Sequence, residues 1–202
     1  MIDSRLTVEA VLRETASFFT KEGIPPARPW SYFGMAIKGD RRNLENARTI
    51  ASIAGNYTAI TSKHVLLDDV KEFEVEWKKM HPEINVYDRD VSLIRKSDYF
   101  IADVTGESVG VDIETAKARR YGKHVTLFCN ETTSKPTLVS HSGGKGALKS
   151  LFTTGYYDAP VFYYNSRNLR EVAERELRNL FVYRHPYKEP ERFEIRKLLD
   201  YT

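Results

Sequence analysis

The stretch Tyr99-Phe-Ile-Ala-Asp-Val-Thr-Gly-Glu-Ser-Val-Gly-Val-Asp-Ile-Glu114 decides the fold class of this chain of 202 residues. It opens with an apolar run that ends at Asp103, and a run of this length without polar alternation predicts a strand buried on both faces. A turn of small residues follows, and the apolar residues after Gly110 recur at helical spacing. We therefore predict a strand, a turn and a helix, which together form one unit of an α/β fold.

The same alternation extends in both directions along the chain. Further strands are predicted at 30–35, 57–62, 123–129 and 161–164. Helices are predicted near 8–19, at 44–54 and 68–80, in a short segment around Asp90, and in two charged segments after 164 that are broken at His185-Pro186. Because the strands lack period-two polarity, the fold class is α/β, with a doubly wound, Rossmann-like parallel sheet flanked by helices.

The sequence predicts one central domain with an extension at each end. Residues 1–29 are expected to form an N-terminal helix and linker, 30–183 the α/β domain, and 184–202 a C-terminal helical extension. The stretch 130–146 is rich in Ser, Thr and Gly, and its length suggests a loop that takes part in function. A solvated connection is the alternative interpretation of this loop.

Composition excludes several functional classes. Lys and Arg number 31 against 28 Asp and Glu, and the two kinds are interleaved, so a nucleic-acid-binding face is not expected. Cys129 is the one cysteine, which leaves no intramolecular disulfide framework or cysteine metal cluster and fits a reduced, cytoplasmic setting. No apolar run is long enough for a signal peptide or a membrane span, so a soluble protein is expected.

Candidate functional residues gather at the carboxyl ends of the predicted strands, where ligands bind in folds of this class. They are Tyr32, Gly34 and Lys38 in and after the first strand, His64 after the second, and Asp103, Ser108, Gly110 and Glu114 after the third. Amides at the start of a helix attract anions, so the turn that carries Ser108 and Gly110, just before the helix of Glu114, is a candidate phosphate site.

Two carboxyl groups are the main candidates for chemistry. Glu114 is expected on the first turn of its helix, where the positive helix end keeps it ionised as a nucleophile or base. Asp90 precedes Asp98 by eight residues and is expected to project toward the same strand ends. Paired carboxyl groups of unequal pKa are typical of enzymes that cleave glycosidic bonds. The alternatives are that Glu114 only complements the helix dipole and that Asp88 or Asp90 only caps a helix.

The order and spacing of these residues resemble the nucleoside 2-deoxyribosyltransferase superfamily over 32–128, about half of the chain. The resemblance is greatest to its nucleotide branch, the 2'-deoxynucleoside 5'-phosphate N-hydrolases and the CMP hydrolases. The elements that carry it are Tyr32-Phe-Gly34, Asp90, Ser97-Asp98, Ile101-Ala-Asp-Val-Thr105, Ser108-Val-Gly-Val111 and Glu114.

The resemblance implies a role for each matching residue. Glu114 would attack C1' of the sugar or stabilise its cation, Asp90 would orient or protonate the departing base, and Tyr32 would position Glu114. Ser108 and the amide of Gly110 would hold the 5'-phosphate. His64 would line the pocket near the base, with an ordinary, partly exposed loop histidine as the alternative.

Three positions depart from the family pattern. Lys38 stands in place of an arginine, Ala36 in place of a hydroxyl residue and Asp112 in place of a glycine, so phosphate affinity is open to question. Ser150 is a candidate to reach the phosphate of a neighbouring subunit. The resemblance also implies a homodimer with sites completed across the interface.

The expected function is hydrolysis of the N-glycosidic bond of a (deoxy)ribonucleoside 5'-monophosphate without metal or organic cofactor. The products would be the free base and (deoxy)ribose 5-phosphate. One alternative is a nucleoside 2-deoxyribosyltransferase that exchanges bases through a glycosyl group on Glu114. Another is a nucleotide-binding sensor without catalysis.

Overall fold

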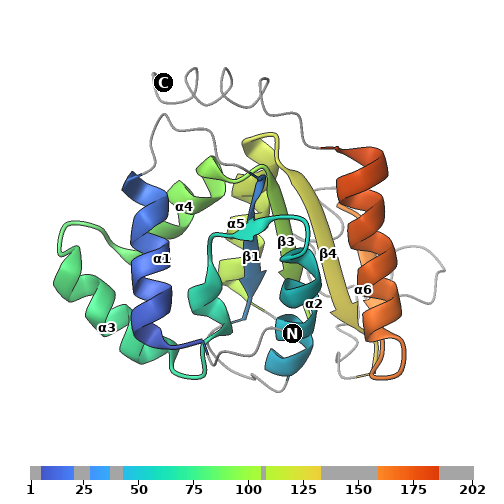
Figure 1. Ribbon diagram of the computed structural model, residues 1–202, viewed down its shortest axis with the longest axis horizontal. Coiled ribbons are helices and arrows are strands. Elements are labelled where there is room, and N and C mark those ends of the chain that lie inside the picture. Colours follow the sequence, from blue (N-terminus) through green and yellow to red (C-terminus); the bar gives the residue numbers. More distant parts are fainter. Residues whose placement is uncertain (1–5, 21–27, 37–42, 106–107, 133–158, 187–202) are drawn as a thin grey trace.

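The computed structural model describes residues 6–20, 28–36, 43–105, 108–132 and 159–186 (Figure 1). Its centre is a five-stranded sheet in which all neighbouring strands run parallel, in the order β2-β1-β3-β4-β5. The strands are β1 (Trp30–Met35), β2 (Ala59–Ile60), β3 (Tyr99–Asp103), β4 (His124–Asn130) and β5 (Val161–Tyr164). The predicted fold class is therefore confirmed, although β2 is shorter than predicted.

The strand order reverses beside β1. The chain passes from β1 to β2 on one side and later to β3 on the other, where Tyr32 is in register with Phe100 and Gly34 with Ala102. In open parallel sheets, ligands bind outside the carboxyl ends of the strands at such a reversal. The ends of β1 and β3 are therefore the expected place for a functional site.

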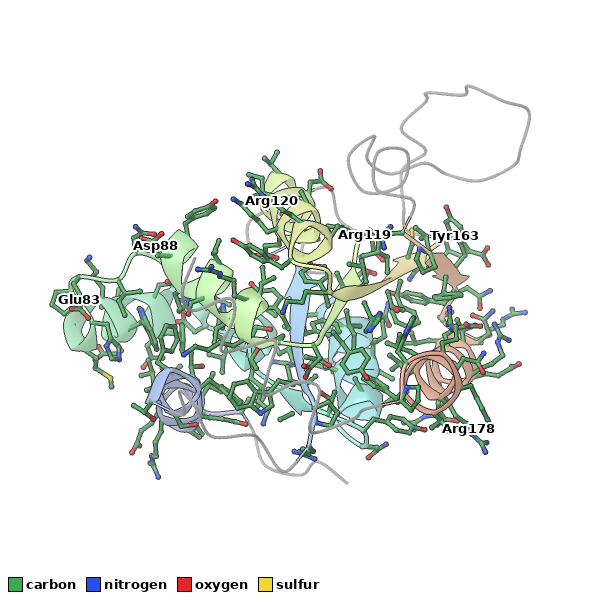
Figure 2. All side chains as sticks on the ribbon, turned by 90° about the horizontal axis from the view of Figure 1, so that it is seen from above. Glu83, Asp88, Arg119, Arg120, Tyr163 and Arg178 are labelled. Atoms are coloured by element: carbon green, nitrogen blue, oxygen red, sulfur yellow. The ribbon has the colours of Figure 1, made fainter. Side chains whose placement is uncertain are left out.

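Helices cover both faces of the sheet. Helices α2 (Leu44–Ala54) and α6 (Leu169–Arg178) pack against each other on one face, and α4 (Val86–Lys96) and α5 (Val109–Arg120) do so on the other (Figure 2). Alternate strand residues enter the two cores, with Phe33 on the α2 and α6 side and Tyr32 on the α4 and α5 side. This division explains why the strands read as continuously apolar.

A third apolar cluster joins α1 (Val8–Thr20) to α3 (Val70–Met80). Its buried members are Val11, Leu12, Leu67, Val70, Phe73 and Trp77. The helix predicted near the N-terminus is thus present and packs against the central domain. Between β2 and α3, a 3-10 turn (Lys63–Leu66) occupies a segment for which the sequence predicted only a loop.

The chain after α6 continues into a π-helical turn (Asn179–Arg184) and breaks at His185, as predicted. The second charged helix predicted beyond this break lies outside the described residues, as do Lys38, Ser150 and most of the loop at 130–146. No helix in the described part of the chain has both the length and the apolar character needed to cross a membrane.

Candidate active site

Tyr32 and Glu114 meet at the reversal point of the sheet. The Tyr32 hydroxyl, at the middle of β1, donates a hydrogen bond of 2.9 Å to Oε1 of Glu114 on α5. Tyr32 is fully buried and its ring stacks on Phe100 of β3 at a centroid distance of 5.6 Å. Two residues 82 positions apart in the sequence are thereby held in one geometry.

Gly34 makes room for the carboxyl group of Glu114. A Cβ atom at this position would lie 3.1 Å from Oε2 of Glu114 and 3.2 Å from the ring of Phe100. Both distances are shorter than ordinary van der Waals contacts, so a side chain here would push Glu114 away. The structure therefore places Gly34 beside the carboxyl group of Glu114, and its role as a substrate contact remains a prediction.

Asp90 lies on α4 and is 7% exposed. Its Oδ1 accepts a hydrogen bond of 2.9 Å from Nε of Arg89 and lies 3.4 Å from Nε2 of His64. The alternative that Asp90 caps a helix is wrong, because Asn85 caps α4 by accepting from the amide of Asp88. Asp90 is thus held by Arg89 next to His64, and its catalytic role remains a prediction.

His64 is fully buried on the 3-10 turn after β2. Its ring stacks on Phe73 at 5.0 Å, and burial together with the charge of Arg89 lowers its pKa, so the ring is neutral. The alternative of a partly exposed loop histidine is therefore wrong. The buried Nδ1 has no hydrogen-bond partner among the described residues.

Asp103 ends β3 with both carboxylate oxygens engaged. Oδ1 accepts from the amide of Thr105 at 2.9 Å, and Oδ2 accepts from the hydroxyl of Tyr164 on β5 at 2.8 Å. The first bond is an Asx turn that starts the loop to α5. In this arrangement Asp103 shapes the loop, and its role as a substrate contact remains a prediction.

Ser108 is the N-cap of α5, and its hydroxyl accepts from the amide of Val111 at 3.4 Å. The amides of Val109 and Gly110 belong to the first turn, where an α-helix offers no carbonyl of its own to accept from them. A Cβ atom at exposed Gly110 would meet only Oγ of Ser108, at 3.5 Å. Space alone thus does not require this glycine, and the helix start remains a candidate anion site.

Two predictions about Glu114 are wrong. It is the sixth residue of α5 and therefore lies on the second turn, while Asp112 occupies the first. Burial and then the charge of Asp90 raise its pKa to about 8, against the lowering effect of the Tyr32 hydrogen bond. The buried surroundings outweigh the helix dipole, whose effect fades beyond the first turn. Glu114 thus carries a proton in the free protein at neutral pH.

Sequence reasoning missed two residues of the site, Arg89 and Glu74. The guanidinium of Arg89 binds Glu74 of α3 through two contacts of 2.9 and 3.0 Å and is fully buried. The available signal was the position of Arg89 directly before Asp90, because a cation there changes the ionisation of the acid.

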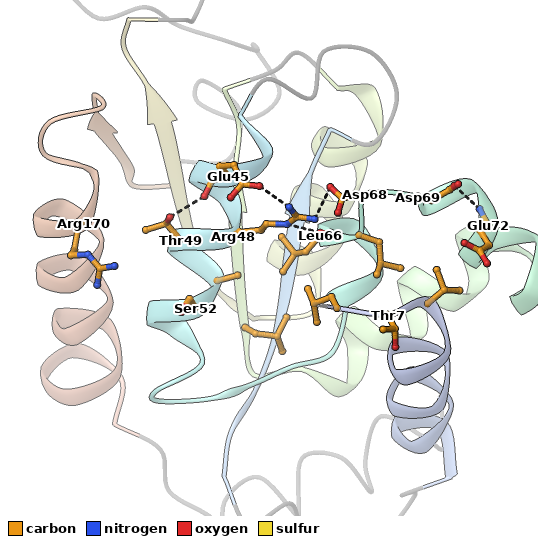
Figure 3. Close-up of a pocket in the computed structure, with 15 residues that line it drawn as sticks. Thr7, Glu45, Arg48, Thr49, Ser52, Leu66, Asp68, Asp69, Glu72 and Arg170 are labelled. Atoms are coloured by element: carbon orange, nitrogen blue, oxygen red, sulfur yellow. Dashed lines mark hydrogen bonds and ion pairs between the residues drawn. The ribbon is translucent and has the colours of Figure 1, made fainter. Parts of the chain in front are cut away.

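A cavity of about 850 Å³ lies elsewhere, between α1, α2 and the segment before α3 (Figure 3). Arg48 spans one wall through ion pairs with Glu45 and Asp68. None of the predicted site residues that the structure describes lines this cavity. In the described residues, His, Cys, Asp and Glu do not gather in threes as a metal site would require.

Comparison with known proteins confirms the resemblance to the nucleotide branch. A 5-hydroxymethyl-dUMP N-hydrolase of Esox lucius is 28% identical over 149 residues, which cover 74% of this chain and 90% of the relative. A protein of Nematostella vectensis, provisionally named 2'-deoxynucleoside 5'-phosphate N-hydrolase 1, is 25% identical over 64% of this chain and 86% of its own. A Thermofilum pendens protein with the same provisional name is 35% identical over 96 residues, which cover 46% of this chain and 63% of the relative. No protein-family model matches the chain.

Proposed function

We propose that this chain is an N-glycosidase that hydrolyses the bond between base and sugar in a nucleoside 5'-monophosphate. The observation that carries the proposal is the contact between Tyr32 and Glu114, with Asp90 near enough for its charge to raise the pKa of both groups. The names of the relatives agree with this chemistry and favour a 2'-deoxynucleotide. The products are the free base and the sugar 5-phosphate.

The two carboxyl groups hold one proton between them at neutral pH. Burial raises the pKa of Asp90, and its contacts with His64 and Arg89 lower that pKa by more, so Asp90 is ionised while Glu114 is protonated. The reaction requires this single proton to leave the carboxyl pair and to bond to the departing base. When the bond from C1' to the base nitrogen breaks, its electron pair leaves with the base, which takes up the proton.

Glu114 then faces the sugar as a carboxylate. It stabilises the positive charge that develops at C1', or bonds to it, and the Tyr32 hydroxyl fixes its orientation. Water then adds to C1', and where Glu114 has bonded to this carbon that bond breaks and returns its electron pair to the carboxylate. The water gives up a proton, which restores the single proton of the carboxyl pair. Because two acids share one proton, the rate is expected to fall at the alkaline side once this proton is lost, near pH 8.

The first test is a set of ribo- and deoxyribonucleoside monophosphates, with the matching free nucleosides, assayed for released base by chromatography. Release from a monophosphate without transfer to an added second base supports the proposed function. Transfer that exceeds hydrolysis, with free nucleosides as the better substrates, would identify a deoxyribosyltransferase. Tight binding with no release from any member would identify a sensor and overturn the proposal.

Tyr32→Phe is expected to lower kcat by about 10- to 100-fold, because a hydrogen bond to a charged group contributes roughly 1.5–3 kcal/mol. The same bond lowers the pKa of Glu114, so its loss should also move the alkaline limb of kcat/KM to higher pH. Rates measured between pH 5 and 10 check both effects. A loss of rate with an unmoved limb would contradict this role for Tyr32.

The start of α5 is proposed to hold the 5'-phosphate through Ser108 and the first helical amides. Ser108→Ala should raise KM for the monophosphate by about 10-fold or more while leaving KM for a free nucleoside unchanged. It should also cost about 1 kcal/mol of stability through loss of the cap. Ser166→Ala, at an exposed position, is the control. Equal effects on both substrates would refute the phosphate contact.

A second copy of this chain is the proposed partner. Val109 and Ile113 are 75% and 44% exposed on one face of α5, and Tyr87 of α4 is 50% exposed with Lys117 near its ring. A two-fold dimer would bury this apolar face beside the turn that carries Ser108. Ile113→Lys should yield a monomer in light scattering, whereas Val182→Lys, at another exposed site, should not. A wild-type monomer would refute the dimer.

A further inference from the structure

Arg89 connects Asp90 of the proposed acid pair to two other elements, α3 and the 3-10 turn. Its Nε donates to Oδ1 of Asp90 at 2.9 Å, and its two terminal nitrogens bind the two oxygens of Glu74 at 2.9 and 3.0 Å. One terminal nitrogen also lies 3.1 Å from Nε2 of His64. Every edge of the planar guanidinium is therefore engaged by a group of fixed position, which a lysine could not reproduce.

Aromatic rings complete the surroundings of this cation. The guanidinium carbon lies 5.2 Å from the ring centre of Phe73 and 5.6 Å from that of Trp77, both on α3. The side chain of Arg89 is fully buried, while that of Glu74 remains 26% exposed. A buried cation that has one full partner and faces a second carboxylate favours the ionised form of the second.

We propose that Arg89, held by Glu74, is a positioning residue that keeps Asp90 ionised and thereby leaves the shared proton on Glu114 in the free protein. The consequence for turnover rests on the function proposed above, whereas the ionisation of Asp90 can be measured without it. Substrate binding must then move the proton off Glu114 before its carboxylate can face C1'. Arg89 thus sets the resting state from which the reaction starts.

His64 lies between the two charged groups. Its Nε2 is 3.1 Å from the guanidinium of Arg89, which can only donate, and 3.4 Å from Oδ1 of Asp90, which can only accept. The shorter contact favours a ring proton on Nδ1, whereas a proton on Nε2 would let His64 share in stabilising the Asp90 carboxylate. In either tautomer the ring is neutral, so among the described residues Arg89 is the cation beside Asp90 at neutral pH.

The titratable and charged groups around Asp90 come from every element packed at the site. They are Tyr32 of β1, His64 of the 3-10 turn, Glu74 of α3, Arg89 of α4 and Glu114 of α5. Among these described groups only Arg89 is positive, since the pKa of His64 is lowered by burial and by Arg89 itself. Removing Arg89 should consequently raise the pKa of Asp90.

The test compares the full-length wild type with the double variant Arg89→Met/Glu74→Leu, which replaces the ion pair with apolar groups. Carbon-13 NMR follows the carboxyl groups of Asp90 and Glu114 against pH, and nitrogen-15 NMR reports the tautomer of His64. The pH profile of kcat/KM is recorded on whichever monophosphate the wild type hydrolyses. Arg13→Met, at an exposed pair on α1, is the matched control.

In the wild type we expect Asp90 to titrate below Glu114 and His64 to carry its proton on Nδ1. In the double variant Asp90 should titrate about 1–3 pH units higher, and the acid limb of kcat/KM should rise with it. The control should match the wild type. An unmoved Asp90 titration would overturn the proposal, as would a wild-type Asp90 that is protonated at pH 7.

A second variant, Arg89→Lys, tests the same contact with the positive charge retained. If the double variant does not fold, Arg89→Lys retains the charge, so Asp90 should stay ionised at pH 7 while His64 loses its preference for a proton on Nδ1. An Nε2-protonated His64 in the wild type would overturn the proposal. If the wild type hydrolyses no monophosphate but Asp90 still titrates below Glu114, the proposed function fails and the assignment of Arg89 stands.

Discussion

Glu114→Gln should abolish turnover and make the protein more stable above neutral pH. Loss of the carboxylate that faces C1' is expected to cost about 10³-fold or more in kcat, because charge stabilisation at the reacting centre is lost. Glutamine keeps the size of the side chain and can still accept the hydrogen bond from Tyr32. The fold is therefore expected to survive the substitution.

The gain in stability follows from the raised pKa of Glu114. Its pKa is about 8 in the folded protein against 4.5 for an exposed glutamate side chain, so the folded state favours the neutral form. The stability that this preference gives is complete below pH 4.5 and is lost as the pH rises through about 8. Glutamine does not ionise, so the advantage of the variant should grow over this interval to the order of a few kcal/mol.

Thermal or urea unfolding at pH 5 and pH 9 measures this advantage directly. Glu171→Gln is the control, because Glu171 is 79% exposed on α6. Its effect on stability should be small at both pH values. An equal change for Glu114→Gln at pH 5 and pH 9 would mean that Glu114 is ionised in the folded protein at neutral pH. Unimpaired hydrolysis by this variant would remove Glu114 from the reaction.

The sequence predicted the parts of the fold that depend on local pattern. The bounds of β3 were predicted correctly, because an apolar run ended by Asp103 can only be a short buried strand in this context. The family resemblance implied that Tyr32 positions Glu114, and the structure brings the two side chains together because β1 and β3, the strand before the helix of Glu114, are neighbours. The two-residue length of β2 could not be predicted, because an edge strand ends where its one neighbour stops pairing.

The ionisation of the site depends on packing that no local pattern reveals. Glu114 was expected to be ionised because its helix position was visible in the sequence, but the packing of its carboxyl group against β1 beside Gly34 was not. Arg89 and Glu74 are 15 positions apart in the sequence and join α4 to α3, and each residue alone resembles an ordinary charge on a helix surface. Tertiary contacts thus decide the protonation states, while sequence spacing decides which residues meet.

Arg89→Met, as a single substitution, should be among the most destabilising changes in the chain. It leaves Glu74 and Asp90 without the cation that they share, and removal of one partner from a buried ion pair costs about 3–5 kcal/mol. Urea unfolding at pH 7 measures this loss. The matched control is Arg13→Met, whose exposed pair with Glu9 should contribute less than about 1 kcal/mol.

The double variant Arg89→Met/Glu74→Leu separates burial from charge. Replacement of a whole buried pair by apolar side chains of similar volume is often neutral, so this variant should recover much of the stability that the single substitution loses. Asp90 remains and can take up a proton in place of its cation, so recovery should be greater at pH 5 than at pH 8. A double variant as unstable as Arg89→Met at both pH values would show that the arginine is held mainly by its stacking on Phe73 and Trp77.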